Sequence, residues 1–252
     1  MAKTILKFLV VFLIGVLGGV WAQASLLPYL AQFQVFQNVG FIRNLGDGQV
    51  TINPTQKVTI QENTALTDAV DEVGKTVVGV RTVTPDGEVL EGSGLIVTSD
   101  GLIVTLASLV PKGSEFYFYV NGEWPSWQVL KRDTVNNLAL IKVGKSGLGT
   151  AAFADPQKTK LGERVFLSEM DFGQRADAQA TNTSLIEPTP AVNEGIVSSV
   201  GDKHIITNIY DPRGDGSPLF DVAGNIVGLN VVDESGRVTT VPISIIRNFI
   251  GL

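Results

Sequence analysis

The sequence predicts an all-β domain that follows an apolar N-terminal segment. From about residue 77 onward, short runs rich in β-branched and aromatic residues alternate with turns that contain glycine, which is the pattern of a sandwich or a barrel. Hydrophobic residues make up 44% of the 252 residues and charged residues 17%, so a sizeable core can form. We expect one folded unit with an N-terminal appendage.

The first 30 residues have the pattern of a membrane segment. Lys3 and Lys7 precede a run from Phe8 to Leu30 that contains no charged side chain, and about 20 apolar residues suffice to cross a bilayer as a helix. The two lysines predict that the N-terminus stays in the cytoplasm. We therefore expect residues 1–30 to anchor the chain in the cytoplasmic membrane by a single transmembrane helix, with the rest on the extracytoplasmic side. The alternative is a signal peptide that is cleaved near Ala24, after which the protein is secreted.

The next segment, residues 31–58, is polar and contains several glycines, and we expect it to be a stalk or linker. The folded domain is then predicted over residues 59–252. It begins with a short amphipathic helix that includes Leu66 and Val73 and that Gly74 terminates.

Hairpin signals organise the rest of the domain. Asp-Gly pairs at Asp86-Gly87 and Asp100-Gly101 separate runs such as LIVTLASLV, as in tight β-turns. The strands fall into two groups, at about 75–150 and 151–243, and a closing helix is predicted over 244–250. Aromatic residues gather around one hairpin of the first group, where we expect them to pack against one another and the alternative is an exposed edge that binds a peptide or a membrane.

Composition excludes several functions. A net charge of -6 lacks the basic surface that phosphate backbones require, so we expect no nucleic-acid partner. The chain contains no cysteine and one histidine, His204, which removes thiol nucleophiles and disulfides from consideration. We expect no cofactor and no metal ion.

Three stretches resemble the active-site segments of the HtrA/Deg-like, trypsin-like serine proteases and occur in that family's order. They are residues 92–110 (GSGLIVTSDGLIVTLASLV), 133–143 (DTVNNLALIKV) and 213–221 (RGDGSPLFD). Residues 193–199 and 241–244 add weaker similarity. The resemblance covers about residues 60–252 and implies two six-stranded antiparallel β-barrels, without the PDZ domain that often follows.

The same resemblance implies that every member of the catalytic triad is replaced. Ser108 stands where the family has its general-base histidine, Asn137 where it has the orienting aspartate, and Asp215 where it has the nucleophilic serine. The degenerate oxyanion loop then comprises Arg213, Gly214, Asp215 and Gly216. Either Asp215 accepts amide hydrogens within this loop, in place of a substrate oxyanion, or it is a solvated turn residue.

These replacements predict an inactive enzyme, because a serine hydroxyl is not deprotonated near neutral pH without an adjacent base. We therefore expect a pseudoprotease that acts as a peptide-binding, protein-binding or scaffold module, with no catalytic residue. The alternative is an active serine endopeptidase with a displaced site that uses Ser217 as the nucleophile. The sequence indicates neither the ligand nor the oligomeric state.

Overall fold

The computed structural model describes residues 2–26, 29, 62–173 and 186–252. The chain divides into two compact units, Met1–Ile60 and Gln61–Leu252. The second unit thus begins at Gln61, and the folded domain was predicted to begin at residue 59. The stalk predicted over 31–58 lies outside the described residues.

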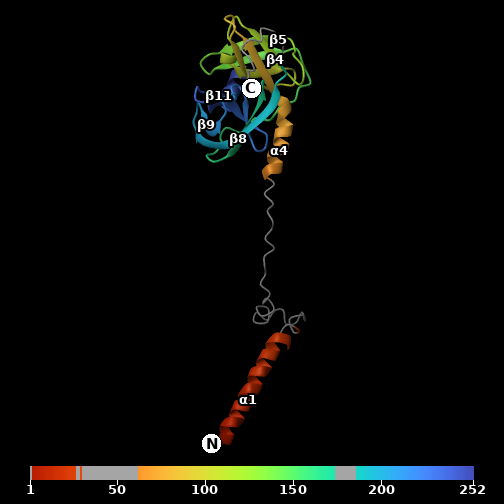
Figure 1. Ribbon diagram of the computed structural model, residues 1–252, viewed down its shortest axis with the longest axis vertical. Coiled ribbons are helices and arrows are strands. Elements are labelled where there is room, and N and C mark those ends of the chain that lie inside the picture. The colour runs from red at the N-terminus through yellow and green to blue at the C-terminus, as the bar shows by residue number, and fades with distance from the viewer. Residues whose placement is uncertain (1, 27–28, 30–61, 174–185) are drawn as a thin grey trace. The chain divides into compact units, whose positions relative to one another are not determined.

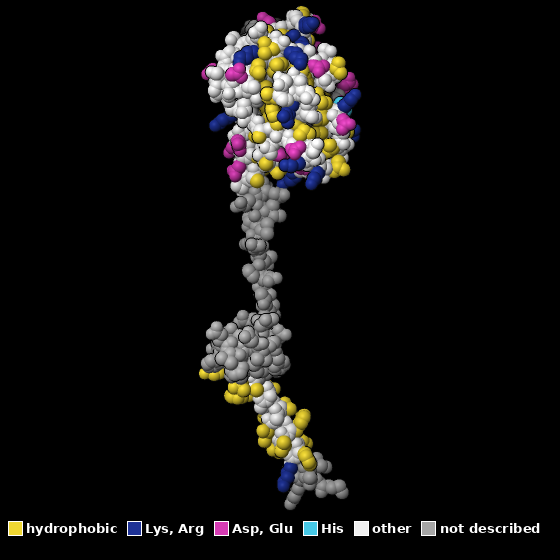
Figure 2. Space-filling model, turned by 180° about the vertical axis from the view of Figure 1, so that it is seen from behind, with side chains coloured by type: hydrophobic (Ala, Val, Ile, Leu, Met, Phe, Trp, Pro, Cys, Tyr) yellow, Lys and Arg dark blue, Asp and Glu magenta, His cyan; other side chains and the backbone are white. Residues whose placement is uncertain are grey.

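The N-terminal unit contains helix α1 (Ala2–Trp21), followed by a short π-helical segment (Ala22–Leu26). Hydrophobic side chains such as Phe8 and Phe12 are exposed on α1. Figure 2 shows yellow hydrophobic side chains along this helix. Across the described residues, no helix combines the length and hydropathy required to cross a membrane. The transmembrane helix predicted within residues 1–30 is thus not found.

The second unit begins with helix α4 (Glu62–Val73) and a 3-10 turn (Gly74–Thr76). The predicted amphipathic helix is confirmed, since its residues Ala69 and Val73 belong to the buried core. The first six strands then form one antiparallel sheet in the order β4-β1-β2-β3-β6-β5. They are β1 (Val77–Val83), β2 (Val89–Ile96), β3 (Leu102–Leu106), β4 (Glu115–Tyr119), β5 (Trp127–Asp133) and β6 (Leu138–Val143).

This first sheet does not close, so the prediction of two closed barrels is wrong for its first half. The edge strands β4 and β5 share no backbone ladder. Instead, the rings of Phe116 on β4 and Trp127 on β5 meet edge-on with centroids 5.0 Å apart. Strand β5 also contains a register shift between Val129 and Lys131, and such bulges bend a strand and end regular pairing. Aromatic packing therefore fills the space where hydrogen bonds would have closed the barrel.

The last six strands form a closed barrel in the order β10-β11-β12-β9-β8-β7, as predicted. They are β7 (Arg164–Asp171), β8 (Thr189–Val200), β9 (Ile205–Tyr210), β10 (Pro218–Asp221), β11 (Ile226–Val232) and β12 (Arg237–Pro242). In Figure 1 the cyan to blue strands labelled β8, β9 and β11 belong to this barrel, and the green strands labelled β4 and β5 belong to the first sheet. The closing helix is confirmed as α5 (Ile243–Ile250), which buries Ile246 and Phe249.

The side chains of β7 point alternately into the barrel and toward the core shared with the first sheet. Val165 and Leu167 belong to the core inside the barrel, whereas Phe166 belongs to the larger core shared with the first sheet. Phe166 also stacks on Phe220 of β10, with ring centroids 5.4 Å apart. Since side chains of a strand point alternately to its two faces, the next inward position of β7 is Glu169.

Candidate functional site

The two positions predicted to correspond to the base and the orienter lie next to each other. Ser108 is exposed in a 3-10 turn (Ala107–Leu109) that follows β3, and Asn137 precedes β6. The Asn137 side chain accepts a hydrogen bond from the Ser108 backbone N–H through Oδ1 (2.9 Å) and donates one to Ser108 Oγ through Nδ2 (3.1 Å). Asn137 has a φ of 54°, a left-handed conformation that asparagine tolerates better than most residues. Both groups are neutral, and neither is a base near neutral pH.

The third position lies on the loop between β9 and β10. Asp215 contacts the first sheet through its backbone, because its carbonyl oxygen accepts a hydrogen bond from Ser93 N–H on β2 (2.8 Å). The neighbouring Gly92 has no room for a side chain, since an added Cβ would lie 2.6 Å from both Asp215 O and Leu109 Cδ1. Leu109 directly follows Ser108 in the 3-10 turn. Tight packing at Gly92 therefore brings the three predicted positions to one region.

The Asp215 carboxylate does not bind the loop's amide hydrogens. Its Oδ1 accepts a hydrogen bond from Val232 N–H at the end of β11 (2.8 Å). The amides of Gly214 and Gly216 donate instead to the carbonyl oxygens of Asp211 and Asn230 (3.2 and 2.9 Å). The prediction that the Asp215 carboxylate accepts amide hydrogens within its own loop is therefore wrong, because its hydrogen-bond donor is Val232 on β11. Nor is the side chain fully solvated: burial raises the pKa of the Asp215 carboxyl above its usual value, and the bond from Val232 opposes this increase.

Ser217, the alternative nucleophile, has no exposed surface (0%). Its Oγ donates a hydrogen bond to the Gly214 carbonyl oxygen (2.6 Å) and accepts one from Asn230 Nδ2 (2.9 Å). Thr240 Oγ1 in turn donates to Asn230 Oδ1 (2.7 Å). The hydroxyl is thus fixed in a buried network and has no basic group as a partner.

The single imidazole lies elsewhere. His204 is exposed in the turn between β8 and β9, where its carbonyl oxygen accepts a hydrogen bond from Gly201 N–H (2.9 Å). Within residues 62–173 and 186–252, no hydrogen bond or ion pair involves its ring. The same part of the chain contains no group of three or more His, Cys, Asp or Glu side chains arranged to hold a metal ion.

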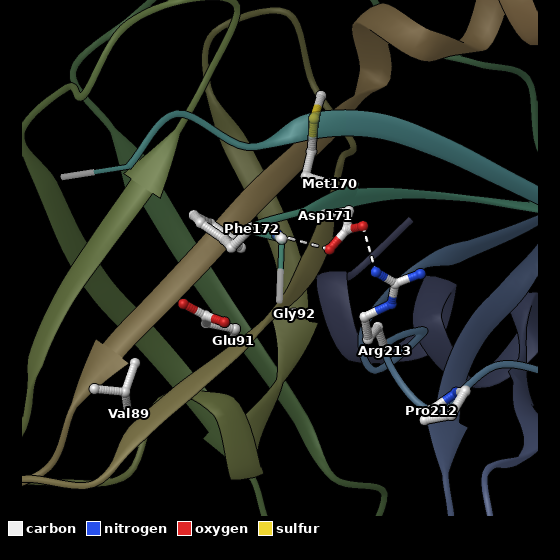
Figure 3. Close-up of a pocket in the computed structure, with 9 residues that line it drawn as sticks. Val89, Glu91, Gly92, Met170, Asp171, Phe172, Pro212 and Arg213 are labelled. Carbon is white, nitrogen blue, oxygen red and sulfur yellow. Dashed lines mark hydrogen bonds and ion pairs between the residues drawn. The ribbon is translucent and has the colours of Figure 1, made fainter. Parts of the chain in front are cut away.

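A cavity of about 550 Å³ lies between the first sheet and the barrel, beside the Asp215 loop. In Figure 3, Arg213 reaches from this loop to Asp171 at the end of β7. Asp171 Oδ2 forms an ion pair with Arg213 Nη1, and its Oδ1 accepts a hydrogen bond from Gly173 N–H (2.9 Å). The lining is completed by Val89, Glu91, Gly92, Met170, Phe172 and Pro212.

Sequence reasoning missed a buried acidic residue beneath this loop. Glu169 occupies an inward position of β7 and is only 2% exposed, and its Oε2 has no hydrogen-bond partner among the residues that the structure describes. Burial raises the pKa of Glu169 to about 7; the charge of Asp211 acts in the same direction, Arg213 opposes it, and Asp171 adds a smaller increase. The sequence does contain a signal for this residue. Strict alternation from Val165 and Leu167 assigns position 169 to the inward face, where a carboxylate is unexpected.

A closed antiparallel barrel packed against a second six-stranded sheet, with the site at their junction, defines a trypsin-like domain. The chain belongs to the trypsin-like peptidase domain family, whose model matches residues 92–229. Its relatives place it more narrowly among HtrA-like proteins.

Two of these relatives show the extent of the similarity. A probable periplasmic serine endoprotease DegP-like of Halomonas elongata is 29% identical over 141 residues, which are 55% of this chain and 28% of that protein. The serine protease Do-like HtrB of Bacillus subtilis is 22% identical over 247 residues, which are 88% of this chain and 53% of that protein. The chain therefore spans between about a quarter and a half of the length of these relatives.

Solved structures support the fold. HtrA-type protease AlgW with a tripeptide matches with a TM-score of 0.62 at 20% identity, over 74% of this chain and 62% of that one. The same protease with a decapeptide matches with a TM-score of 0.60 at 18% identity, over 74% and 66%.

Proposed function

We propose that this chain is a pseudoprotease, an HtrA-like domain that binds a peptide or protein segment without cleaving it. The observation that carries the proposal is the Ser108–Asn137 pair: where the family resemblance expects an imidazole and a carboxylate, two neutral side chains bond to each other. Neither of these two side chains can accept a proton from a nucleophile near neutral pH. The burial of Ser217 and the distant turn position of His204 support the same conclusion.

An activity-based probe tests the absence of hydrolysis. We expect a fluorophosphonate to leave the full-length chain unlabelled, because covalent capture requires an activated serine. An active HtrA-type protease serves as the positive control. Labelling that disappears in Ser217→Ala but persists in His204→Asn would establish the displaced endopeptidase instead.

Binding is supported by the cavity beside the Asp215 loop, and relatives of the same fold have been solved with a tripeptide and a decapeptide. We expect the fluorescence anisotropy of fluorescein-labelled casein peptides to increase when the chain is added. Val89→Trp, which fills the cavity, should weaken this binding at least tenfold, whereas Val222→Trp, an exposed valine outside the cavity lining, should not. Equal binding by both variants would exclude the cavity as the binding site.

We further propose an extracytoplasmic location at the cytoplasmic membrane, because the DegP-like relatives are described as periplasmic. Exposed apolar side chains such as Phe8 and Phe12 suit a segment that inserts during export. Alkaline extraction of membranes, combined with N-terminal sequencing, distinguishes the two alternatives. A retained N-terminus in the pellet indicates an anchor, and a new N-terminus near Ala24 in the soluble fraction indicates a cleaved signal.

A further inference from the structure

Glu169 is a buried acid, with 2% of its surface exposed. Within residues 62–173 and 186–252, it forms no ion pair of its own and its Oε2 has no hydrogen-bond partner. A carboxylate that is ionised in such a place requires a cation or several hydrogen-bond donors. The structure is therefore compatible with a protonated Glu169 and unfavourable for an ionised one.

The charged groups around Glu169 come from three elements. Asp171 lies two residues further along β7, Asp211 lies at the end of β9, and Arg213 lies on the following loop. From β8, Asn193 contributes a neutral amide that donates to Asp211 Oδ2 (3.2 Å). Three carboxyl groups thus share one guanidinium.

Arg213 is the group that is able to move. Its side chain is 55% exposed, whereas that of Asp171 is 18% exposed, so the guanidinium can change partners with little loss of packing. Its backbone stays in place because Asp211 Oδ1 accepts a hydrogen bond from Arg213 N–H (3.2 Å). In Figure 3 the Arg213–Asp171 pair forms one wall of the cavity.

We propose that Glu169 is a proton-operated switch of this wall. When its carboxyl group is protonated, Arg213 stays on Asp171, as in the structure. When it ionises, the guanidinium turns inward to neutralise the buried charge and leaves the Asp171 carboxylate facing the cavity. The second state therefore favours a ligand with a lysine or arginine, a consequence that rests on the proposed binding function, whereas the switch itself does not.

The pKa of Glu169 determines the pH at which the two states exchange. Burial raises the pKa of Glu169 to about 7, so the two states exchange near neutral pH. An exposed glutamate, with a pKa near 4.3, would stay ionised throughout this range and would switch nothing.

Methionine labelling provides a direct test on the full-length chain. The sequence contains two methionines, and one of them, Met170, follows Glu169 and lines the cavity. In a chain labelled with [13C-methyl]methionine and held in detergent micelles, we expect the Met170 signal to shift between pH 5.5 and 8.5 with a midpoint near 7. The Met1 signal serves as an internal reference.

Three variants identify the titrating group. Glu169→Gln should abolish the transition, and His204→Asn should leave it unchanged, which excludes the single histidine as its origin. Arg213→Gln should move the midpoint to higher pH, because it removes the cation that favours ionised Glu169. This last variant also keeps the test decisive if Glu169→Gln fails to fold. A Met170 signal that stays flat in the wild type, a transition that survives in Glu169→Gln, or a midpoint that Arg213→Gln does not raise would overturn the proposal.

Discussion

Replacing Glu169 by glutamine should change how stability depends on pH. The folded chain binds the Glu169 proton with a pKa of about 7, whereas the unfolded chain binds it with the ordinary glutamate pKa of 4.5. Between these values the unfolded state holds fewer protons, so the free energy of unfolding falls as the pH rises. The stabilisation is fully present below pH 4.5 and is lost as the pH passes through about 7.

The magnitude follows from the two pKa values. A difference of about 2.5 pH units at 1.36 kcal/mol per unit gives about 3 kcal/mol across this range. Glu169→Gln cannot ionise and should lose this dependence, and at pH 8 it should be more stable than the wild type by up to about 3 kcal/mol. Urea unfolding of both full-length chains in detergent micelles, at intervals from pH 4.5 to 8, measures the effect.

The matched control is Glu194→Gln, because Glu194 forms an exposed ion pair with Arg164 across β7 and β8 and such pairs contribute little. It should follow the wild-type curve. If wild type and Glu169→Gln give parallel curves over the whole range, then Glu169 is ionised in the folded state and the reasoning is refuted.

Three further substitutions test the packing of the site by urea unfolding. Asn230→Ala should lower the free energy of unfolding by about 2 kcal/mol or more, because it removes the side chain that donates a hydrogen bond to the buried Ser217 hydroxyl. An unchanged free energy of unfolding would show that this network does not contribute to stability. Asn137→Ala should cost about 1 kcal/mol, since alanine at a φ of 54° is strained and both side-chain bonds are lost, and Asn137→Gly should cost less if backbone strain dominates. Gly92→Ala should cost about 1–3 kcal/mol through overpacking, whereas Gly74→Ala, with open space around its Cβ, should stay within about 0.5 kcal/mol.

Much of the fold follows from local pattern. The helices that include Leu66 and Ile246 and the succession of strands along the chain were predictable, because side-chain periodicity and Asp-Gly turns act over a few residues. Whether the first sheet closes into a barrel was not predictable. Whether β4 and β5 pair or meet through Phe116 and Trp127 depends on strand curvature and register, which the sequence pattern does not encode.

The site divides in the same way. The resemblance predicted Ser108, Asn137 and Asp215 as the positions of the replaced triad, and the structure brings their segments together around Gly92 and Leu109. The partner of the Asp215 carboxylate was missed, because Val232 lies on a strand that only tertiary pairing brings to the loop.

By itself, the sequence determined which reactive side chains are available: it contains one histidine and no cysteine. It also predicted neutral side chains at two of the three positions that the resemblance assigns to the triad. Tertiary structure alone decided which groups are buried and which are paired. Ser217 was considered as an alternative nucleophile and Glu169 was not considered at all, yet both side chains are buried. The physical reason is that burial determines the free energy of ionising a carboxyl group and whether a hydroxyl is accessible to a substrate. Burial in turn depends on contacts between residues far apart in the chain.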